Sequence, residues 1–359
     1  MPRRPIPWAA SPHTLAKISI LQNYLGAWIP ILGKLGGLNI IDGFSGPGEY
    51  WSVNGGPRPK GSPIVAMETA LYHKNYPAGH RLYFCFVDQD KRCTEHLAGL
   101  VGAYNLPPHI VVDIVNGTFE DVVAGLLDDM KAEGRMLAPT FVLIDPCGVK
   151  GVPMALVHRI LQIPRSEVMV NLMTSAMVRF ATRPEFAPHL DALFGCQDWR
   201  AYIGLPEEEL DWALADLYQR QLPPTIFSRL FRMRDRKHRP LYDLVFATRH
   251  ELGVAKMKEA MWRVSPTIEY EFSDAYAGQL TIFGSPDLSG LRMGLTSELR
   301  GRTLSIEQLT RHVVLKTPYL SSHLRKSALI PMEDASAIRI VSPRKRAHSY
   351  PDGTMIHFL

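Results

Sequence analysis

The segment Leu38-Asn-Ile-Ile-Asp-Gly-Phe-Ser-Gly-Pro-Gly48 consists of an apolar run, a carboxylate and a glycine-rich turn. The apolar residues 38–41 predict a buried β-strand that ends at Asp42. Gly46 and Gly48 predict a turn whose backbone can approach a ligand closely. A strand, an acidic residue and a glycine turn in this order are typical of a doubly wound α/β sheet that binds an adenine-containing cofactor.

Further apolar segments follow, and most of them end in polar residues. The predicted strands are 81–87, 109–115, 140–144, 167–172, 241–248 and 279–283. Continuous apolar strands that alternate with helical stretches are typical of a parallel sheet covered on both faces. We therefore predict a mostly parallel sheet of seven strands, preceded by an amphipathic helix over residues 14–32.

The chain is predicted to contain two domains. Residues 1–290 would form a Rossmann-like α/β domain, and residues 291–359 a smaller one. Within the first domain, residues 179–240 fit the strand pattern poorly and are interpreted as a mainly helical insertion. The insertion ends in a basic run over 229–239, which is either a solvated loop or a nucleic-acid contact.

The C-terminal residues carry the excess positive charge. Residues 291–359 contain 11 Lys or Arg and 5 Asp or Glu, a net charge of +6, whereas the preceding residues contain 29 and 30, a net charge of −1. Two predicted helices, 305–314 and 319–329, precede two short strands, 337–341 and 354–358. This order predicts a winged helix that contacts either nucleic acid or another protein. The candidate nucleic-acid-binding residues are Arg325, Lys326, Arg344, Lys345 and Arg346.

Composition excludes several classes of protein. The four cysteines, which form no C-x-x-C pair, predict neither a disulfide framework nor a metal site, and indicate a reducing cytoplasm. No apolar run reaches the roughly 20 residues that span a bilayer, so no membrane association is predicted. The first residues lack the apolar stretch of a secretory signal.

Acidic residues at several strand ends predict a site for S-adenosylmethionine. Asp42 would face the amino group of this methyl donor, and Asp88 would hold its ribose. Gly46 and Gly48 would lie beside its methionine tail. The candidate cofactor-binding residues are Asp42, Phe44, Gly46, Gly48, Ser62, Asp88, Thr118 and Phe119. Ser62 is also predicted to cap the helix that follows it. Thr118 and Asp121 are predicted to form a capping arrangement at the start of the helix after the third strand.

The fourth strand ends in Asp145-Pro146-Cys147-Gly148, where two chemistries remain open. Asp145 could accept a hydrogen bond from an exocyclic amino group, although an aromatic residue usually follows Asp-Pro in that case. Alternatively, the Cys147 thiolate could add to a pyrimidine ring, or the cysteine could be a buried apolar residue. His13 and Lys17 are further candidates for proton transfer or phosphate binding.

Taken together, these residues resemble the three-Cys-motif partner (TcmP) family. The matching segments are Pro12-His13-Thr14-x-x-Lys17, Ile20-Leu21, Tyr24-Leu25, Asp42 to Gly48, Gly61-Ser62-Pro63, Asp88, Ile144-Asp145-Pro146-x-Gly148, Tyr242 to His250, Gly253, Met257-Lys258 and Met261-Trp262. The resemblance implies a class I methyltransferase-like fold. It also implies a three-Cys-motif partner, similar to radical S-adenosylmethionine enzymes, that would hold an iron–sulfur cluster.

The same residues are similar to the large-subunit ribosomal RNA adenine methyltransferase group, which implies that His13, Lys17 and Asp145 flank the reacting base. Many relatives carry an aromatic residue at position 147, and Cys147 departs from that pattern. We therefore expect a methyltransferase that acts on DNA or RNA. A non-catalytic adaptor that binds the cofactor and nucleic acid is the alternative, and a nicotinamide-dependent dehydrogenase is a more distant one because its glycine spacing is absent.

Overall fold

The computed structural model divides into two compact units. The first comprises residues 1–264 and 271–279, and the second comprises 265–270 and 280–359. The residues that the structure describes are 5–52, 55–73, 79–276, 287–344 and 346–359. No helix within these ranges is long and apolar enough to cross a lipid bilayer.

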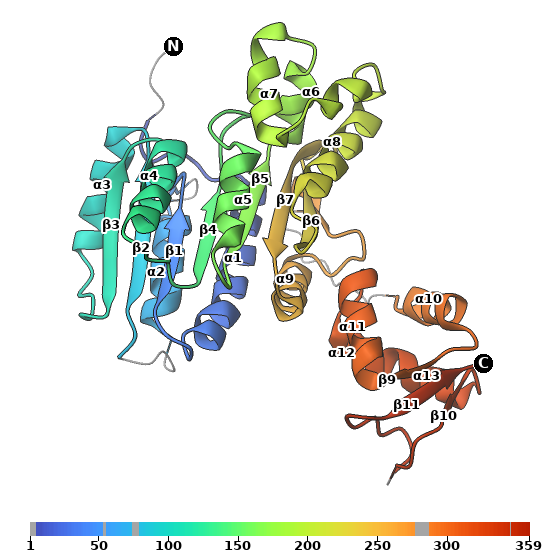
Figure 1. The fold of residues 1–359 in the computed structure, drawn as a ribbon. Coiled ribbons are helices and arrows are strands. Elements are labelled where there is room, and N and C mark those ends of the chain that lie inside the picture. The colour runs from blue at the N-terminus through green and yellow to red at the C-terminus, as the bar shows by residue number, and fades with distance from the viewer. Residues whose placement is uncertain (1–4, 53–54, 74–78, 277–286, 345) are drawn as a thin grey trace. The chain divides into compact units, whose positions relative to one another are not determined.

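The first unit is built on one sheet with the strand order β3-β2-β1-β4-β5-β7-β6-β8 (Figure 1). The strands are β1 Leu38–Asp42, β2 Leu82–Asp88, β3 Ile110–Asn116, β4 Thr140–Ile144, β5 Glu167–Leu172, β6 Phe227–Arg234, β7 Pro240–Thr248 and β8 Glu271–Ser273. Only β7 runs antiparallel to its neighbours, β5 and β6. The mostly parallel, Rossmann-like sheet is therefore confirmed, whereas the predicted number of seven strands is wrong, because the described residues contain eight in this sheet.

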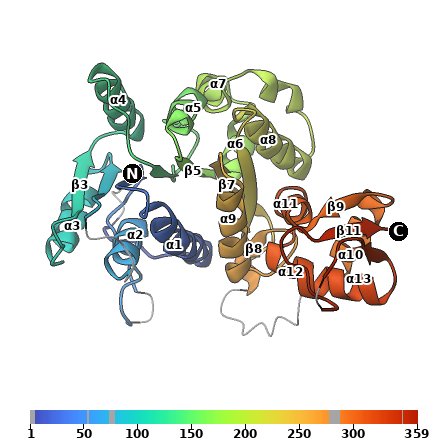
Figure 2. The same ribbon diagram turned by 60° about the horizontal axis from the view of Figure 1, so that its bottom comes forward.

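Helices cover both faces of this sheet, as Figure 2 shows, with α1, α2 and α9 on one face and α4, α5 and α8 on the other. The longer helices are α1 Pro12–Leu32, α2 Ser62–Leu71, α3 Lys91–Gly102, α4 Phe119–Ala132, α5 Met154–Gln162, α6 Thr174–Phe180, α7 Ala187–Phe194, α8 Glu207–Gln221 and α9 Glu251–Val264. Short 3-10 turns are η1 Pro184–Phe186, η2 Asp198–Tyr202 and η3 Asp274–Tyr276. This layering buries the continuous apolar strands that the sequence predicts.

Buried polar contacts tie helix α1 to the sheet. Ser11 caps the helix by accepting a hydrogen bond from the Thr14 amide. Further along, the Tyr24 hydroxyl donates to Glu167 at the start of β5, and the Thr248 hydroxyl at the end of β7 donates to the same carboxyl group over 2.6 Å. Burial raises the pKa of Glu167 to about 7. The contacts of Tyr24 and Thr248 with Glu167 hold the middle of α1 against β5 and β7.

The interpretation of residues 179–240 as a mainly helical insertion requires a correction. Helices α6, α7 and α8 lie there, but the basic run enters strand β6 instead of a loop. Arg232 is 1% exposed and donates two hydrogen bonds of 2.8 Å to Asp243 on β7, and it also pairs with Asp211 on α8. Alternate side chains of a strand face opposite sides, so a basic residue on the inner face needs buried acidic partners. The predicted strand over 279–283 lies outside the described residues.

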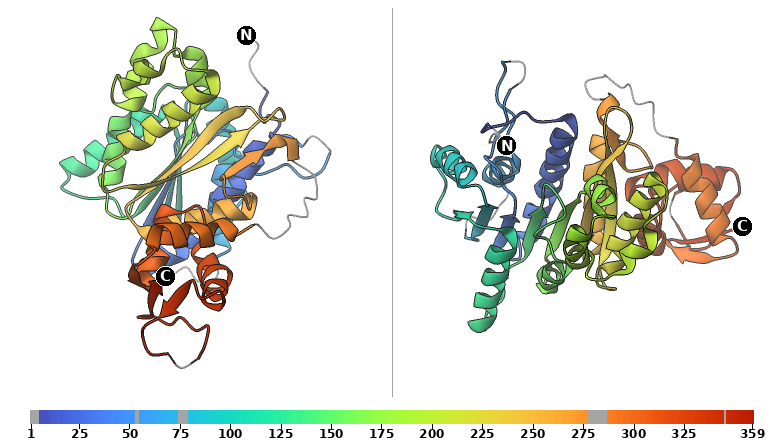
Figure 3. Two further views of the ribbon diagram at one scale, coloured as in Figure 1. Left: turned by 90° about the vertical axis from the view of Figure 1, so that its right-hand side faces the viewer. Right: turned by 90° about the horizontal axis from the view of Figure 1, so that it is seen from above.

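The second unit, coloured orange to red in Figure 3, has its own apolar core and a three-stranded antiparallel sheet in the order β10-β11-β9. Its elements are α10 Ser289–Leu299, β9 Thr303–Ser305, α11 Ile306–Lys316, α12 Ser321–His323, η4 Leu324–Leu329, α13 Ile330–Asp334, β10 Ile338–Ile340 and β11 Met355–Phe358. Ser305 and Gln308 form a capping box at the start of α11, with hydrogen bonds of 3.3 and 2.9 Å.

Candidate active site at the ends of the parallel strands

Two carboxylates mark the point where the strand order of the sheet reverses. Asp42 is the last residue of β1, and Asp145 directly follows β4, the parallel neighbour of β1. Strand β2 lies on the other side of β1, so the chain winds in opposite directions from the β1–β4 pair. In open α/β sheets, ligands bind beyond the carboxyl ends of the strands at such a point.

Asp42 is 2% exposed, and burial raises its pKa to about 7, against the opposing effects of the Ser62 hydroxyl and the Phe44 amide. Its Oδ1 accepts the Phe44 N–H over 3.2 Å, while its buried Oδ2 makes no hydrogen bond of ordinary geometry within the described residues. An unsatisfied buried oxygen is costly, so this atom indicates a donor supplied by a ligand. The expectation that Ser62 caps α2 is wrong: Gly61 is the N-cap, and Ser62 faces Asp42.

The loop that carries Gly46 and Gly48, called the glycine loop below, contacts the end of β2 and helix α3. Gly46 and Gly48 have φ angles of +58° and +83°, which favour glycine. The Gly46 amide donates to Asp88 Oδ2 over 2.9 Å, and the Asp90 amide donates to Asp88 Oδ1 over 2.8 Å. A Cβ on Gly48 would lie 2.5 Å from Leu97 Cδ1, so the close approach at Gly48 is to helix α3. Each Asp88 oxygen retains a lone pair that can accept a further hydrogen bond.

Aromatic side chains pack beneath the start of the glycine loop. Phe119 is buried, and its ring centre lies 5.7 Å from that of Phe44. A Cβ on Gly43 would lie 2.2 Å from Phe119 Cδ2, a constraint that sequence reasoning missed. Thr118 is exposed and caps α4 by accepting the Asp121 amide over 3.1 Å, as its spacing predicts. The Thr118 hydroxyl is therefore occupied by the helix, whereas the two phenylalanines form an apolar surface at the strand end.

Asp145 is held in place by two side chains from distant elements. The Lys17 ammonium group, on helix α1, forms an ion pair with Asp145 Oδ2 and is 9% exposed. Asn171, on β5, donates its amide to Asp145 Oδ1 over 2.5 Å, and the buried Asn171 Oδ1 makes no hydrogen bond within the described residues. Lys17 Nζ also lies 5.7 Å from the ring centre of Tyr242. The carboxylate thus has a fixed orientation beside a second, unused acceptor.

His13 lies at the same site, linked to residues far away in the sequence. Its Nδ1 lies 2.8 Å from Asp274 Oδ2, and its ring contacts that of Tyr242 edge to face at 5.6 Å. The Tyr242 hydroxyl donates to the His13 carbonyl oxygen over 3.3 Å. Burial raises the pKa of Tyr242, and the charges of Asp145 and Asp274 raise it further. The structure therefore brings His13, Lys17 and Asp145 into one cluster.

Sequence reasoning missed three members of this cluster. Asn171 carried a usable signal, because an amide interrupts the otherwise apolar second half of β5. Tyr242 lies within one of the segments of the family resemblance but had no assigned role. Asp274 carried no signal, because 261 positions separate it from His13.

The two residues that follow Asp145 differ in their exposure to solvent. Pro146 is buried, whereas the Cys147 side chain is exposed and forms no disulfide. The interpretation of Cys147 as a buried apolar residue is therefore wrong. The turn presents a thiol and no aromatic ring beside Asp145.

The predicted nucleic-acid-binding residues of the second unit differ in their surroundings. Those that the structure places on the surface are Arg325, Lys326 and Arg346. Arg344 instead pairs with Glu333, which also accepts the Tyr350 hydroxyl over 2.7 Å. Arg344 lowers the pKa of Glu333 to about 2, so the charge of Arg344 is balanced within the unit. Lys345 lies outside the described residues.

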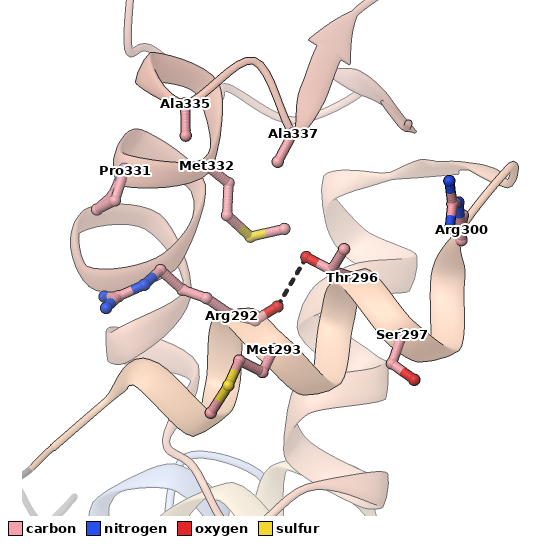
Figure 4. A pocket seen from close by; sticks show the side chains of 9 residues that line it. All are labelled: Arg292, Met293, Thr296, Ser297, Arg300, Pro331, Met332, Ala335 and Ala337. Carbon is pink, nitrogen blue, oxygen red and sulfur yellow. Dashed lines mark hydrogen bonds between the residues drawn. The ribbon is translucent and has the colours of Figure 1, made fainter.

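The second unit also contains an open hollow of about 570 Å³ (Figure 4). Its lining residues are Arg292, Met293, Thr296, Ser297, Arg300, Pro331, Met332, Ala335 and Ala337. The Arg292 guanidinium group donates to the Ser327 carbonyl oxygen over 3.0 Å, and the Thr296 hydroxyl donates to that of Arg292 over 2.9 Å. None of the predicted site residues lines this hollow.

Comparisons with known proteins return similar structures only. No protein-family model and no curated protein matches the chain. An O-methyltransferase from Bacillus cereus, solved with S-adenosylhomocysteine, is 10% identical with a TM-score of 0.36, over 63% of this chain and 80% of its own. Human methyltransferase-like protein 13, also with S-adenosylhomocysteine, is 13% identical with a TM-score of 0.32, over 70% and 90%. Human methyltransferase 10 domain containing protein is 16% identical with a TM-score of 0.30, over 65% and 82%. Because these TM-scores are low, the fold assignment rests on the strand order itself.

Proposed function

We propose that the protein is an S-adenosylmethionine-dependent methyltransferase that acts on a base of DNA or RNA. The observation that carries the proposal is the placement of Asp42 and Asp145 at the β1–β4 switch point. Among the described residues, one buried oxygen atom of Asp42 and one of Asn171 have no hydrogen-bond partner there. An amide oxygen and an ionised carboxylate only accept hydrogen bonds, so the site with Asp42 ionised suits ligands that bring N–H or O–H donors.

The residues at the strand ends fit this cofactor. Asp42 Oδ2 would accept from its ammonium group, Asp88 would accept from its ribose hydroxyls, and the backbone at Gly46 permits close approach. Phe44 and Phe119 would supply an apolar surface. When bound, the cofactor supplies a methyl group on a positively charged sulfur.

The chain's own contribution to the reaction would be placement of the acceptor. Asp145, oriented by Lys17 and Asn171, would accept a hydrogen bond from an amino group of the acceptor. The unused Asn171 Oδ1 could accept a second one. Fixing the acceptor in line with the methyl group removes much of the entropic barrier to transfer. This arrangement favours an amino acceptor, whereas addition of the exposed Cys147 thiolate to a pyrimidine is the second chemistry.

Two experiments test the proposal. Calorimetry measures the binding of S-adenosylhomocysteine and S-adenosylmethionine, and a second assay measures the transfer of a labelled methyl group to mixed DNA and RNA. We expect binding of both ligands and label in one class of nucleic acid. Absence of binding for both would contradict the proposal. Binding without transfer would instead support a non-catalytic adaptor for a three-Cys-motif partner, which the missing aromatic at Cys147 favours.

Affinity for S-adenosylhomocysteine is expected to rise about tenfold between pH 6 and pH 8. Burial raises the pKa of Asp42 to about 7, so the free protein binds a proton there at pH 6 and has largely lost it at pH 8. Because an ammonium group pairs with the ionised carboxylate, binding requires loss of that proton and weakens as the pH falls below 7. Calorimetry at pH 6, 7 and 8 measures the trend, and Asp42→Asn should bind weakly with little pH dependence. A wild-type affinity that is constant over this range would contradict the role of Asp42.

The second unit would supply affinity for nucleic acid. Its helices and three-stranded antiparallel sheet support a winged helix, and its net positive charge suits phosphate contacts. Arg325 and Lys326, exposed on η4, and Arg346 would make those contacts, which weaken as the salt concentration rises.

A further inference from the structure

A base that reacts outside a nucleic-acid stack needs a flat surface to replace its lost stacking partners. The turn after Asp145 provides no such surface, because Cys147 stands where an aromatic ring would serve this purpose. If the site takes a base, another part of the chain must supply the ring. The first unit contains aromatic side chains from two segments near the glycine loop.

Trp8 and Tyr50 form an aromatic pair at this place. Their ring centres lie 6.5 Å apart at an interplanar angle of 75°, and both side chains are half-buried. The pair is fixed by the backbone: the Trp51 amide donates to the Trp8 carbonyl oxygen over 2.8 Å, and Ala9 forms a β-bridge with Trp51. The N-terminal segment is thereby attached to the loop that follows Gly48.

This aromatic pair lies against the glycine loop of the proposed active site. A Cβ on Gly46 would lie 3.6 Å from Cζ2 and Cη2 of Trp8, so the indole edge lies against the glycine loop. Tyr50 also contributes to the raised pKa of the buried Tyr242, whose ring centre lies 5.7 Å from Lys17 Nζ. Two electron-rich rings therefore lie beside the proposed cofactor loop.

We propose that Trp8 and Tyr50 form the stacking surface for a planar heteroaromatic acceptor, in place of the aromatic residue that the turn after Asp145 lacks. This inference rests on the proposed function and names the residues that would select its substrate class. Trp51 belongs to the same loop but lies on its other side: it is 53% exposed and stacks on Arg58 at 5.2 Å. Successive residues of an extended segment face opposite ways, which explains the different surroundings of Tyr50 and Trp51.

A fluorescence experiment tests the inference. The full chain, saturated with S-adenosylhomocysteine, is mixed with single-stranded DNA or RNA oligonucleotides that contain 2-aminopurine, and the fluorescence of this base is measured. Stacking on an indole quenches this base, so we expect quenching by the wild-type protein. Trp8→Ala should abolish most of the quenching and weaken binding about tenfold, in line with the loss of one stacked base. Trp8→Phe should retain binding, and Trp51→Ala, the matched control, should behave as the wild type.

Several outcomes would overturn the inference. The inference fails if the wild-type protein causes no quenching or if Trp8→Ala quenches as strongly as the wild type. It also fails if Trp51→Ala loses as much quenching as Trp8→Ala. Calorimetry on each variant separates this inference from the proposed function. If Trp8→Ala loses S-adenosylhomocysteine and oligonucleotide in parallel, Trp8 only supports the glycine loop and the inference fails. If the wild-type protein does not bind S-adenosylhomocysteine, the proposed function fails instead.

Discussion

Replacing Asp145 with alanine is expected to lower the rate of methyl transfer at least about a hundredfold, while the affinity for S-adenosylhomocysteine changes by less than about threefold. The carboxylate is positioned by Lys17 and Asn171 toward the acceptor, whereas the proposed cofactor contacts are made at Asp42 and Asp88. Loss of Asp145 therefore removes the orientation of the acceptor and leaves the cofactor contacts in place. Single-turnover transfer of a labelled methyl group and calorimetry measure the two quantities separately.

Two further variants make this prediction specific. Asp145→Asn keeps an acceptor oxygen but removes the negative charge, so an intermediate loss of rate is expected. Asp216→Asn changes an exposed carboxylate on α8 that pairs with Arg220 and serves as the control. Retained turnover in Asp145→Ala would remove this residue from the mechanism. A parallel loss of cofactor affinity would instead show that Asp145 maintains the fold of the site.

Replacing Arg232 with methionine is expected to lower the free energy of unfolding by about 3–5 kcal/mol. Arg232 is the positive charge between two buried carboxylates, Asp211 on α8 and Asp243 on β7. It also stacks on Trp212, with its guanidinium carbon 3.6 Å from the ring centre. Burial already raises the pKa of Asp243 to about 6, against the effect of Arg232. Without the guanidinium group, two acidic side chains would remain buried after losing the cation that forms ion pairs with both of them.

Urea denaturation of the variants measures this effect. The triple variant Arg232→Met, Asp211→Asn, Asp243→Asn should recover much of the lost stability, because the buried charges are removed together. Arg220→Met breaks the exposed ion pair with Asp216 on α8 and should cost less than about 1 kcal/mol. A cost below about 1 kcal/mol for Arg232→Met would show that the buried triad does not hold α8 on the sheet.

Local sequence patterns predicted much of the sheet. The predicted ranges 140–144 and 167–172 coincide with β4 and β5, because both are mostly apolar, as is typical of strands buried on both faces. The same reasoning failed for β6, where Arg229, Arg232 and Arg234 concealed a strand. A charged side chain is predicted to be exposed to solvent unless its ion-pair partners are known. The partners of Arg232 lie on other elements, so the sequence around β6 does not indicate them.

The sequence by itself determined which strand ends carry carboxylates and where glycine permits a sharp turn, because both depend on residues adjacent in the chain. Only the tertiary structure decided what surrounds Asp145: Lys17 from α1, Asn171 from β5 and Tyr242 from β7. It also decided that Trp8 lies against the loop that carries Gly46 and Tyr50. Such groupings arise when α1 and the neighbouring strands pack together, and no local pattern records contacts between residues on separate elements.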